Sequence, residues 1–174
     1  SFTPASNSCS RTGYTFAGWT VSGTSDVKSS AFTWKYTENK TFTAKWTACS
    51  YTVAYDANGG TGTMENQQVI YGVRSTLNPN AFTRYGYTFA GWTAYRTAQN
   101  QWYYTNGTTN TWYTEGSQPA GYELYRYKDQ QAMSKISAVH EDTVVLHAQW
   151  NPNSYIARYD ANGGTTSPRS QGYD

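Results

Sequence analysis

The stretch RYGYTFAGWT at residues 84–93 decides the fold of this chain, because the chain repeats it. Residues 11–20 read RTGYTFAGWT, which differs at one position. A second motif is also present twice, as YTVAYDANGG at 51–60 and as YIARYDANGG at 155–164. Repetition of this length predicts a row of similar small domains rather than one continuous fold.

The spacing between the copies shows which unit is complete. Tyr51 and Tyr155 lie 104 residues apart, whereas Gly13 and Gly86 lie only 73 apart. The second copy of the GYTFAGW unit has therefore gained about thirty residues. We expect an incomplete unit at 1–50, a complete unit at 51–154 with an insertion at about 95–142, and the first part of a further unit at 155–174.

The composition favours a β-rich fold with an aromatic core. Leu, Ile, Val and Phe supply only 20 of 174 residues, but the net charge is +2 and the chain holds 17 Tyr and 7 Trp. Each buried aromatic side chain removes roughly 150–250 Å² from water, which is enough to build a small core. Thr, Tyr, Val, Gly and Asn favour strands and tight turns over helices.

Alternating apolar residues place the strands. In the complete unit we expect strands at 51–56, 67–71, 86–92 and 143–150; in the first unit they fall at 13–19 and 41–46. In the last strand Val144, Leu146, Ala148 and Trp150 share one face, which we interpret as core. The stretch between Gly72 and the third strand contains Pro79 and leaves room for a single helical turn at most.

Several classes of function are unsupported. Charged residues are sparse and mixed in sign, which disfavours nucleic acid as a partner. No apolar stretch reaches the roughly 20 residues that span a bilayer. Because residue 1 falls inside a repeat, we expect the chain to be a segment of a longer protein.

The two cysteines, Cys9 and Cys49, both lie in the first unit. An isolated pair in a secreted small domain predicts a disulfide. The alternative is a buried free Cys9 with an exposed Cys49. A metal site needs more ligands, and His140 and His147 lie near neither cysteine in sequence.

Two further chemical interpretations are weak. The DANGG motif offers two oxygen-bearing side chains where Ca²⁺ wants six or more oxygens, so we interpret it as a turn whose Asn and Gly tolerate positive φ. Glu115, Glu123 and Asp129 could supply a carboxylate pair of the glycosidase kind, but nothing in the sequence fixes their separation. We therefore expect no catalytic residue, no metal and no cofactor.

The insertion is the most aromatic part of the chain. Flat rings beside Asn, Gln and Thr suit a sugar or peptide ligand. The structural alternative is an extra hairpin in which QWYYT at 101–105 pairs with TWYTE at 111–115 across NGTTN. The candidate ligand-binding residues are Trp102, Tyr103, Tyr104, Trp112, Tyr113, Tyr122, Tyr125 and Tyr127.

The motifs YDANGGTG, TLNPNAFTRYGYTFAGW and LHAQW together resemble the Listeria–Bacteroides repeat, the B-repeat type of module of internalin-like surface proteins. This resemblance covers 51–94 and 143–150, with shorter pieces at 11–19, 41–46 and 155–164. It implies a β-rich α+β, β-grasp-like (ubiquitin-like) fold with a mainly antiparallel sheet, carried in tandem on secreted or wall-attached bacterial proteins. It also implies adhesion, spacing or ligand display, and no catalytic residues.

The sequence therefore predicts an extracellular stalk or adhesive module on a bacterial cell surface or secreted protein. The alternative is a carbohydrate- or protein-binding module, with a host or cell-wall glycan or protein as ligand, built on the aromatic insertion. The incomplete first unit leaves a sheet edge unpaired, and residues 155–174 carry the strand it lacks. We expect these half-repeats to pair by strand complementation, with neighbouring repeats or neighbouring chains as partners.

Overall fold

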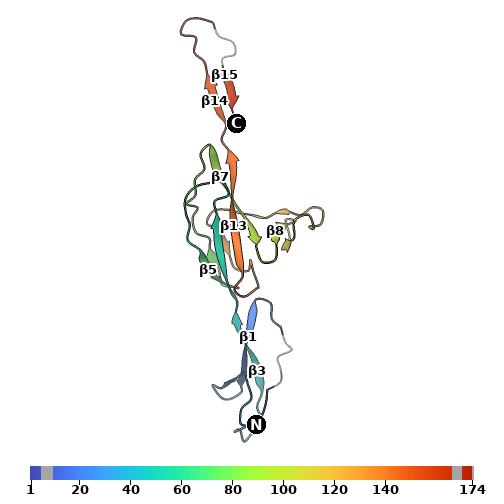
Figure 1. Cartoon of the computed structure of the whole chain (residues 1–174). Coiled ribbons are helices and arrows are strands. Elements are labelled where there is room, and N and C mark those ends of the chain that lie inside the picture. Colours follow the sequence, from blue (N-terminus) through green and yellow to red (C-terminus); the bar gives the residue numbers. More distant parts are fainter. Residues whose placement is uncertain (5–9, 166–169, 174) are drawn as a thin grey trace.

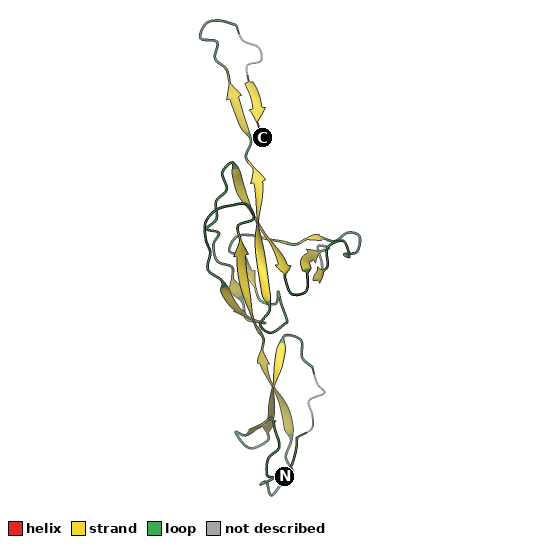
Figure 2. Cartoon of the chain, in the orientation of Figure 1, coloured by secondary structure: helices red, strands yellow, loops and turns green. Residues whose placement is uncertain are grey.

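The computed structural model describes residues 1–4, 10–165 and 170–173, and in these ranges every regular element is a β-strand (Figure 2). The β-rich prediction is confirmed. The α part of the predicted α+β fold is not observed, because no helix forms between the second and third strands of the complete unit within the described chain. Pro79 lies in this stretch, and the residue before a proline disfavours helical torsions.

The first unit is a small antiparallel sheet at the N-terminal end of the row (Figure 1). Its strand order is β2-β1-β3, so β3 lies at the edge of the sheet. A single bridge between Phe2 and Phe32 closes the unit at its far end. The strands are β1 (Tyr14–Val21), β2 (Val27–Lys28) and β3 (Phe42–Ala48).

The complete unit is built on a central sheet in the order β5-β4-β13-β7. The two inner strands, β4 and β13, run parallel, whereas the two outer pairs are antiparallel. A two-stranded sheet of β6 and β12 lies beside it. These strands are β4 (Ser50–Asp56), β5 (Gln67–Ile70), β6 (Ser75–Thr76), β7 (Tyr87–Arg96), β12 (Ala132–Met133) and β13 (Thr143–Pro152).

The insertion forms a lateral arm, which we define as residues 97–125, projecting from the row (Figure 1). It contains β8 (Gln101–Thr105), β9 (Asn110–Tyr113) and β10 (Glu123–Leu124), and the predicted hairpin of β8 and β9 is confirmed. After the arm, β11 (Arg126–Tyr127) pairs with Trp92 and Thr93 as β2 pairs with Trp19 and Thr20. The inserted residues that the first unit lacks therefore lie between β7 and β11.

The glycine of the AGW motif lets this short strand approach. Gly91 has a φ of 110°, and a Cβ added to it would lie 2.4 Å from the carbonyl oxygen of Tyr127. Gly18, the matching residue of the first unit, has a φ of 116°, and a Cβ added to it would lie 2.9 Å from Cγ1 of Val27 and 3.2 Å from the carbonyl oxygen of Lys28. A side chain at either position would displace the neighbouring strand.

The core of the complete unit surrounds the tryptophan of the same motif. Trp92 is fully buried, and the rings of Tyr55, Phe82 and Phe89 approach it edge-on with centroid distances of 5.2, 6.0 and 4.8 Å. The predicted apolar face of β13 is confirmed, because Val144, Leu146 and Ala148 are fully buried and Trp150 packs against them. Aromatic rings thus fill the space that aliphatic side chains fill in most small cores.

The DANGG motif forms the turn that its residues predict. Asn58 adopts a φ of 45°, and its N–H donates to Oδ1 of Asp56 at 2.6 Å. Its Nδ2 donates to the carbonyl oxygen of Ala148 at 2.8 Å. The Asp and Asn side chains thus hold the turn against β13, and the predicted turn is confirmed.

Residues 155–173 contain a second copy of the β4–β5 hairpin. The strands β14 (Tyr155–Arg158) and β15 (Ser170–Tyr173) are antiparallel, with Tyr155 opposite Tyr173. In the complete unit Tyr51 lies opposite Val69, so both strands are displaced by the same 104 residues and the register is identical.

Candidate functional site

The arm has two faces, and they divide the eight predicted ligand-binding residues, of which Tyr127 lies in β11 directly after the arm. Along β8 successive side chains point to opposite sides, so Tyr103 lies opposite Trp112 on one face and Trp102 lies opposite Tyr113 on the other. None of the eight is more than half exposed. The two faces have different roles.

The inner face belongs to the core. The ring of Tyr103 lies 4.8 Å from that of Trp112, and Tyr125 lies 4.6 Å from Tyr127. The indole N–H of Trp112 donates to the carbonyl oxygen of Ile136 at 2.9 Å. Burial strongly raises the pKa of the Tyr127 phenol, so this group stays neutral. These four residues join the arm to the sheet, as the structural interpretation of the insertion requires.

The outer face carries two groups of rings, which the pairing of Trp102 with Tyr113 places side by side; together we call them the outer aromatic band. Trp102 lies 4.7 Å from Tyr95 and 5.2 Å from the His147 ring, and Tyr113 lies 6.1 Å from Tyr104 and 5.3 Å from Tyr122. The band comprises Tyr95, Trp102, Tyr104, Tyr113, Tyr122 and His147. Four of its members belong to the predicted binding set, and these four point away from the core cluster. They are Trp102, Tyr104, Tyr113 and Tyr122.

Sequence reasoning missed Tyr95 and His147 as members of this band. The alternation of β7 puts Tyr95 on the side opposite Trp92, and the alternation of β13 puts His147 opposite Leu146. The alternation along each strand could be read from the sequence. The antiparallel pairing of β7 with β13 could not, because it joins residues fifty apart in sequence.

The histidine of the band favours its uncharged form. Desolvation lowers the pKa of His147, and the nearby Asp56 carboxylate, 3.8 Å from Nδ1, opposes this only in part. Desolvation, followed by Tyr122, raises the pKa of Tyr113. Neutral rings with a few amides at the rim, such as Asn106 donating to the Tyr122 hydroxyl at 3.1 Å, form a surface for stacking rather than for ion binding.

The three carboxylates considered for catalysis lie in different parts of the chain. Oδ1 of Asp129 accepts a hydrogen bond from the backbone N–H of Asn80 at 2.8 Å, which is a structural role. Glu115 lies exposed in the loop after β9, and Glu123 is exposed in β10 opposite Thr105. Within the described ranges, no three His, Cys, Asp or Glu side chains cluster closely enough to hold a metal ion. Over the same ranges, no helix has the length and apolar character to cross a membrane.

Cys49 is buried and carries a free thiol in this structure. The alternative in which Cys49 is exposed is therefore wrong. Cys9, its predicted disulfide partner, lies outside the described residues, and the pairing stays a prediction.

A packed joint connects the first unit to the complete one, with Cys49 at its centre. The N–H of Cys49 donates to the carbonyl oxygen of Gly13 at 2.8 Å, and the carbonyl oxygen of Cys49 accepts from Tyr71 N–H at 2.8 Å. The rings of Tyr14 and Tyr71 meet edge-on at 5.9 Å. A Cβ on Gly13 would lie 2.2 Å from the Tyr71 ring. The two units are thus in direct contact across a single linking residue.

The model of the Listeria–Bacteroides repeat domain family matches residues 2–45 and 51–115. The chain is 27% identical over 165 residues to a protein described as a Gly-rich membrane protein of Evansella cellulosilytica, covering 93% of this chain and 15% of that protein. It is 34% identical over 102 residues to Internalin H of Listeria monocytogenes, covering 55% of this chain and 17% of Internalin H. The chain thus spans less than a fifth of the length of these relatives. No solved structure matches it.

Proposed function

This chain belongs to the Listeria–Bacteroides repeat family, and on that premise we propose that it is a non-catalytic spacer segment of a bacterial surface or secreted protein. The similarity to Internalin H supports an extracellular location. In this role the folded units set a distance along the row, and the arm is displayed to its side (Figure 1).

The observation that carries this proposal is that the connections between units are short. One residue separates β3 from β4, and two residues separate β13 from β14. At the second connection the N–H of Asn153 donates to the carbonyl oxygen of Gly86 at 2.8 Å, the same contact that Cys49 makes with Gly13. Repeated short connections with repeated hydrogen bonds keep successive units in one direction, as a spacer needs.

The sheet order supports a β-grasp-like ancestry for the unit. Two antiparallel strand pairs, β4–β5 and β7–β13, are joined through their parallel inner strands. This is the order expected of a β-grasp sheet. We propose that the loop between β6 and β7 runs where such folds place a helix.

The joint between the first unit and the complete unit provides the test of the spacer proposal. Gly13 and Gly86 share a φ of 77°, but a Cβ would strike the Tyr71 ring at Gly13 and would meet nothing within 4 Å at Gly86. Small-angle X-ray scattering at low protein concentration should show a broader range of molecular lengths for Gly13→Ala than for the natural chain. Gly86→Ala carries the same backbone strain and should leave the range unchanged.

An insertion supplies the reference for a flexible joint. Three glycines placed between Cys49 and Ser50 should broaden the range of lengths strongly. If the natural chain already scatters like this insertion variant, its units are not held in one direction and the spacer proposal fails.

A second function, glycan binding by the outer aromatic band, is favoured by one observation. Trp102 lies between Tyr95 and His147, so three neutral rings form one surface. Aromatic faces of this kind stack against sugars, with amides fixing their orientation. An adhesive role for the module would rest on this band.

A glycan array probed with the full chain tests the second function. Trp102→Ala should reduce any binding at least about tenfold, since a buried aromatic contact is worth about 1.4 kcal/mol or more. Tyr85→Ala is the matched control, because Tyr85 is fully exposed and lies outside the band. Binding that survives Trp102→Ala would place the ligand elsewhere.

A further inference from the structure

Four side chains form one row across four strands of the complete unit, on the face of the sheet that points away from the core. Thr93 of β7 lies directly opposite His147 of β13 on one side and directly opposite Arg126 of β11 on the other. His147 in turn lies opposite Asp56 of β4. In the antiparallel pairs the facing Cβ atoms are roughly 4.5–5.5 Å apart. The row therefore presents, in order, a carboxylate, an imidazole, a hydroxyl and a guanidinium group.

The side chain of Gln149 reaches this row at the threonine. Its Nε2 donates to Oγ1 of Thr93 at 2.9 Å. Because Cδ of the glutamine is bonded to Nε2, an acyl carbon lies one bond beyond this contact. Thr93 is only 2% exposed, so the contact is shielded from water. A hydroxyl and an amide are thus held together where water competes little for the acyl carbon.

His147 has the features of a base for the Thr93 hydroxyl. Its Nδ1 lies 3.8 Å from Oδ2 of Asp56, which favours the tautomer with hydrogen on Nδ1. Its Nε2 is buried and has no hydrogen-bond partner among the described residues. Desolvation lowers the pKa of His147, so the ring is neutral and able to accept a proton. Carboxylate, imidazole and hydroxyl in this order are the arrangement that activates a nucleophile for acyl transfer.

Arg126 supplies a positive charge on the other side of the threonine. A Cβ added to Gly91 would lie 3.1 Å from Cγ and 3.5 Å from Cδ of Arg126, so the arginine stem crosses this glycine. Gly91 is directly opposite Gln149. The missing side chain at Gly91 thus lets Arg126 lie beside the glutamine. A cation there stabilises the negative oxygen that develops when an amide carbon is attacked.

We propose that Thr93 and Gln149 become joined by an ester bond that the chain forms once, on itself. Nε2 of His147 takes the hydroxyl proton of Thr93 while Oγ1 attacks Cδ of Gln149. The bond between Cδ and Nε2 of Gln149 then breaks, and the nitrogen takes the proton from His147 and leaves as ammonia. A hydroxyl and a primary amide thus give an ester and ammonia, and no electrons are transferred to or from another molecule.

The bond would tie β7 to β13 across 56 positions of sequence. Such a link removes conformational freedom from the unfolded chain, as a disulfide does. The closed loop contains the whole arm and β11, so the inserted chain would stay attached to the sheet even when the sheet opens. The inference goes beyond the spacer role, because it rests on the chemistry of this row and not on the short connections.

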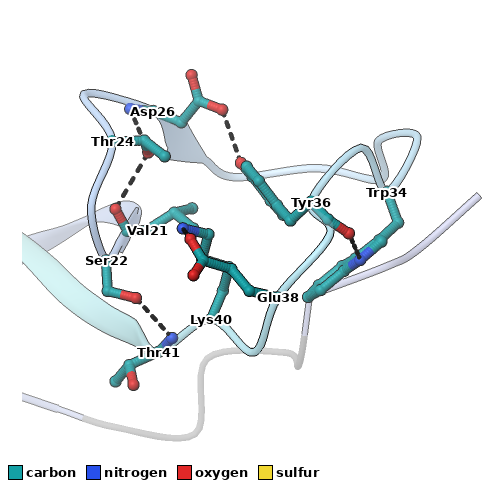
Figure 3. Close-up of polar contacts among 9 residues, drawn as sticks. All are labelled: Val21, Ser22, Thr24, Asp26, Trp34, Tyr36, Glu38, Lys40 and Thr41. Atoms are coloured by element: carbon teal, nitrogen blue, oxygen red, sulfur yellow. Dashed lines mark hydrogen bonds and ion pairs between the residues drawn. The ribbon is translucent and has the colours of Figure 1, made fainter.

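The first unit offers an internal comparison. It keeps the threonine as Thr20, but Thr43 and Lys45 stand at the places of the histidine and the glutamine. The Thr20 hydroxyl donates to the carbonyl oxygen of Thr43 at 3.0 Å. The loops of this unit are held by hydrogen bonds such as the one from the Tyr36 hydroxyl to Oδ2 of Asp26 at 2.6 Å (Figure 3). We expect no ester in this unit, because it has neither the base nor the amide.

A second pair in the complete unit makes the same contact without the same surroundings. Nε2 of Gln68 donates to Oγ1 of Thr52 at 2.7 Å, and this pair is exposed. Thr52 lies opposite Gln68 on one side and Thr143 on the other, so no histidine faces its hydroxyl. We expect this pair to stay unlinked, and it serves as the control within the natural chain.

Intact-mass spectrometry of the full chain, followed by tryptic mapping, tests the bond. The natural chain should be lighter by one ammonia, and peptides 85–96 and 136–158 should be recovered as one linked product. Mild alkali should separate the two peptides, because it hydrolyses an ester much faster than an amide. A succinimide at an Asn-Gly pair, such as Asn58 and Gly59, also loses ammonia but joins no peptides.

Variants assign the roles of the residues. Thr93→Val removes the hydroxyl at nearly constant volume and should abolish the link, whereas Thr93→Ser should form it. Gln149→Glu should also abolish it, since an ionised carboxylate resists attack and has no ammonia to release. His147→Gln should slow linking at least about 100-fold. Near-ultraviolet circular dichroism of each variant checks that aromatic packing is kept, so that a lost link is not a lost fold.

Three outcomes would overturn the proposal. One is a natural chain that keeps its full mass at neutral pH, and another is a linked product that persists in Thr93→Val. The third is linking between Thr52 and Gln68, because that pair has no histidine opposite its hydroxyl. None of these outcomes touches the spacer proposal, which is tested at the joint.

Discussion

The indole N–H of Trp150 donates a hydrogen bond to the carbonyl oxygen of Ala57 at 2.9 Å. The two residues are 93 positions apart, one near the end of β13 and the other in the DANGG turn. A Cβ on Gly60 would lie 2.8 Å from the same indole, so the turn folds directly onto the ring. The last strand of the complete unit and the repeated DANGG turn thus meet in one contact.

Trp150→Phe should destabilise the complete unit by about 0.5–1.5 kcal/mol, because it removes one of the two donors to the Ala57 carbonyl oxygen and leaves only the Gly60 N–H. Trp46→Phe is the matched control: Trp46 occupies the same place in β3, which pairs only with β1 among the strands that the structure describes. Urea unfolding monitored by the remaining tryptophans measures both. Equal losses would mean that the hydrogen bond contributes nothing beyond ring packing.

Gly91→Ala should destabilise the complete unit and detach β11, because the new Cβ would overlap the Tyr127 carbonyl oxygen. We expect a loss of at least about 2 kcal/mol, which exceeds the strain of a positive φ alone. Gly107→Ala controls for that strain, since Gly107 also has a positive φ but meets nothing within 4 Å. Hydrogen exchange at Arg126 and Tyr127 reports detachment directly, and unchanged protection there would contradict the mechanism.

The complete unit should become less stable as the pH is lowered, because His147 favours its neutral form in the folded state. Its pKa is lowered by desolvation, so the folded state favours the neutral ring. The stabilisation is therefore present above the unfolded pKa of about 6.5 and is lost as the pH falls towards the folded value. His147→Gln cannot take up a proton and should show a smaller loss between pH 7.5 and pH 5. A loss as large as that of the natural chain would assign the pH dependence to other groups.

The two faces of the arm should respond differently to truncation. Tyr127→Ala should destabilise the complete unit by about 3–5 kcal/mol, since it empties a fully packed site. Tyr113→Ala removes a half-buried ring of the outer aromatic band and should have a much smaller effect. Thermal unfolding of the two variants checks this difference. Similar melting temperatures would place both rings in one core.

Local features of the fold could be read from the sequence. The alternation of β4 and β13, the turn residues of DANGG and the NG of the arm all act through neighbouring residues, so the strands and turns fall close to their predicted positions. The core role of Trp92 follows from the same alternation. The absence of a helix before β7 was harder to predict, because the chain there has too few apolar residues to favour either state.

Long-range features could not be read in the same way. The parallel pairing of Thr143 with Thr52 joins residues 91 positions apart and leaves no local pattern. Which aromatic residues of the arm face the core depends on the register of β8 against β7. A shift of that register by one residue would exchange the positions of Tyr103 and Trp102. The eight aromatic residues were therefore recognisable as a group but not as core and surface.

The parallel pair at the centre of the complete unit also determines how it resists a pull. β4 leads directly from the first unit and β13 leads directly into β14, so tension along the row acts on opposite ends of these two strands. Because the strands are parallel, their hydrogen bonds from Thr52–Thr143 to Asp56–His147 are loaded in shear and must break together rather than one at a time. A protein that is pulled by fluid flow, or by an attached surface that moves away, would thus transmit force through each unit before any unit unfolds.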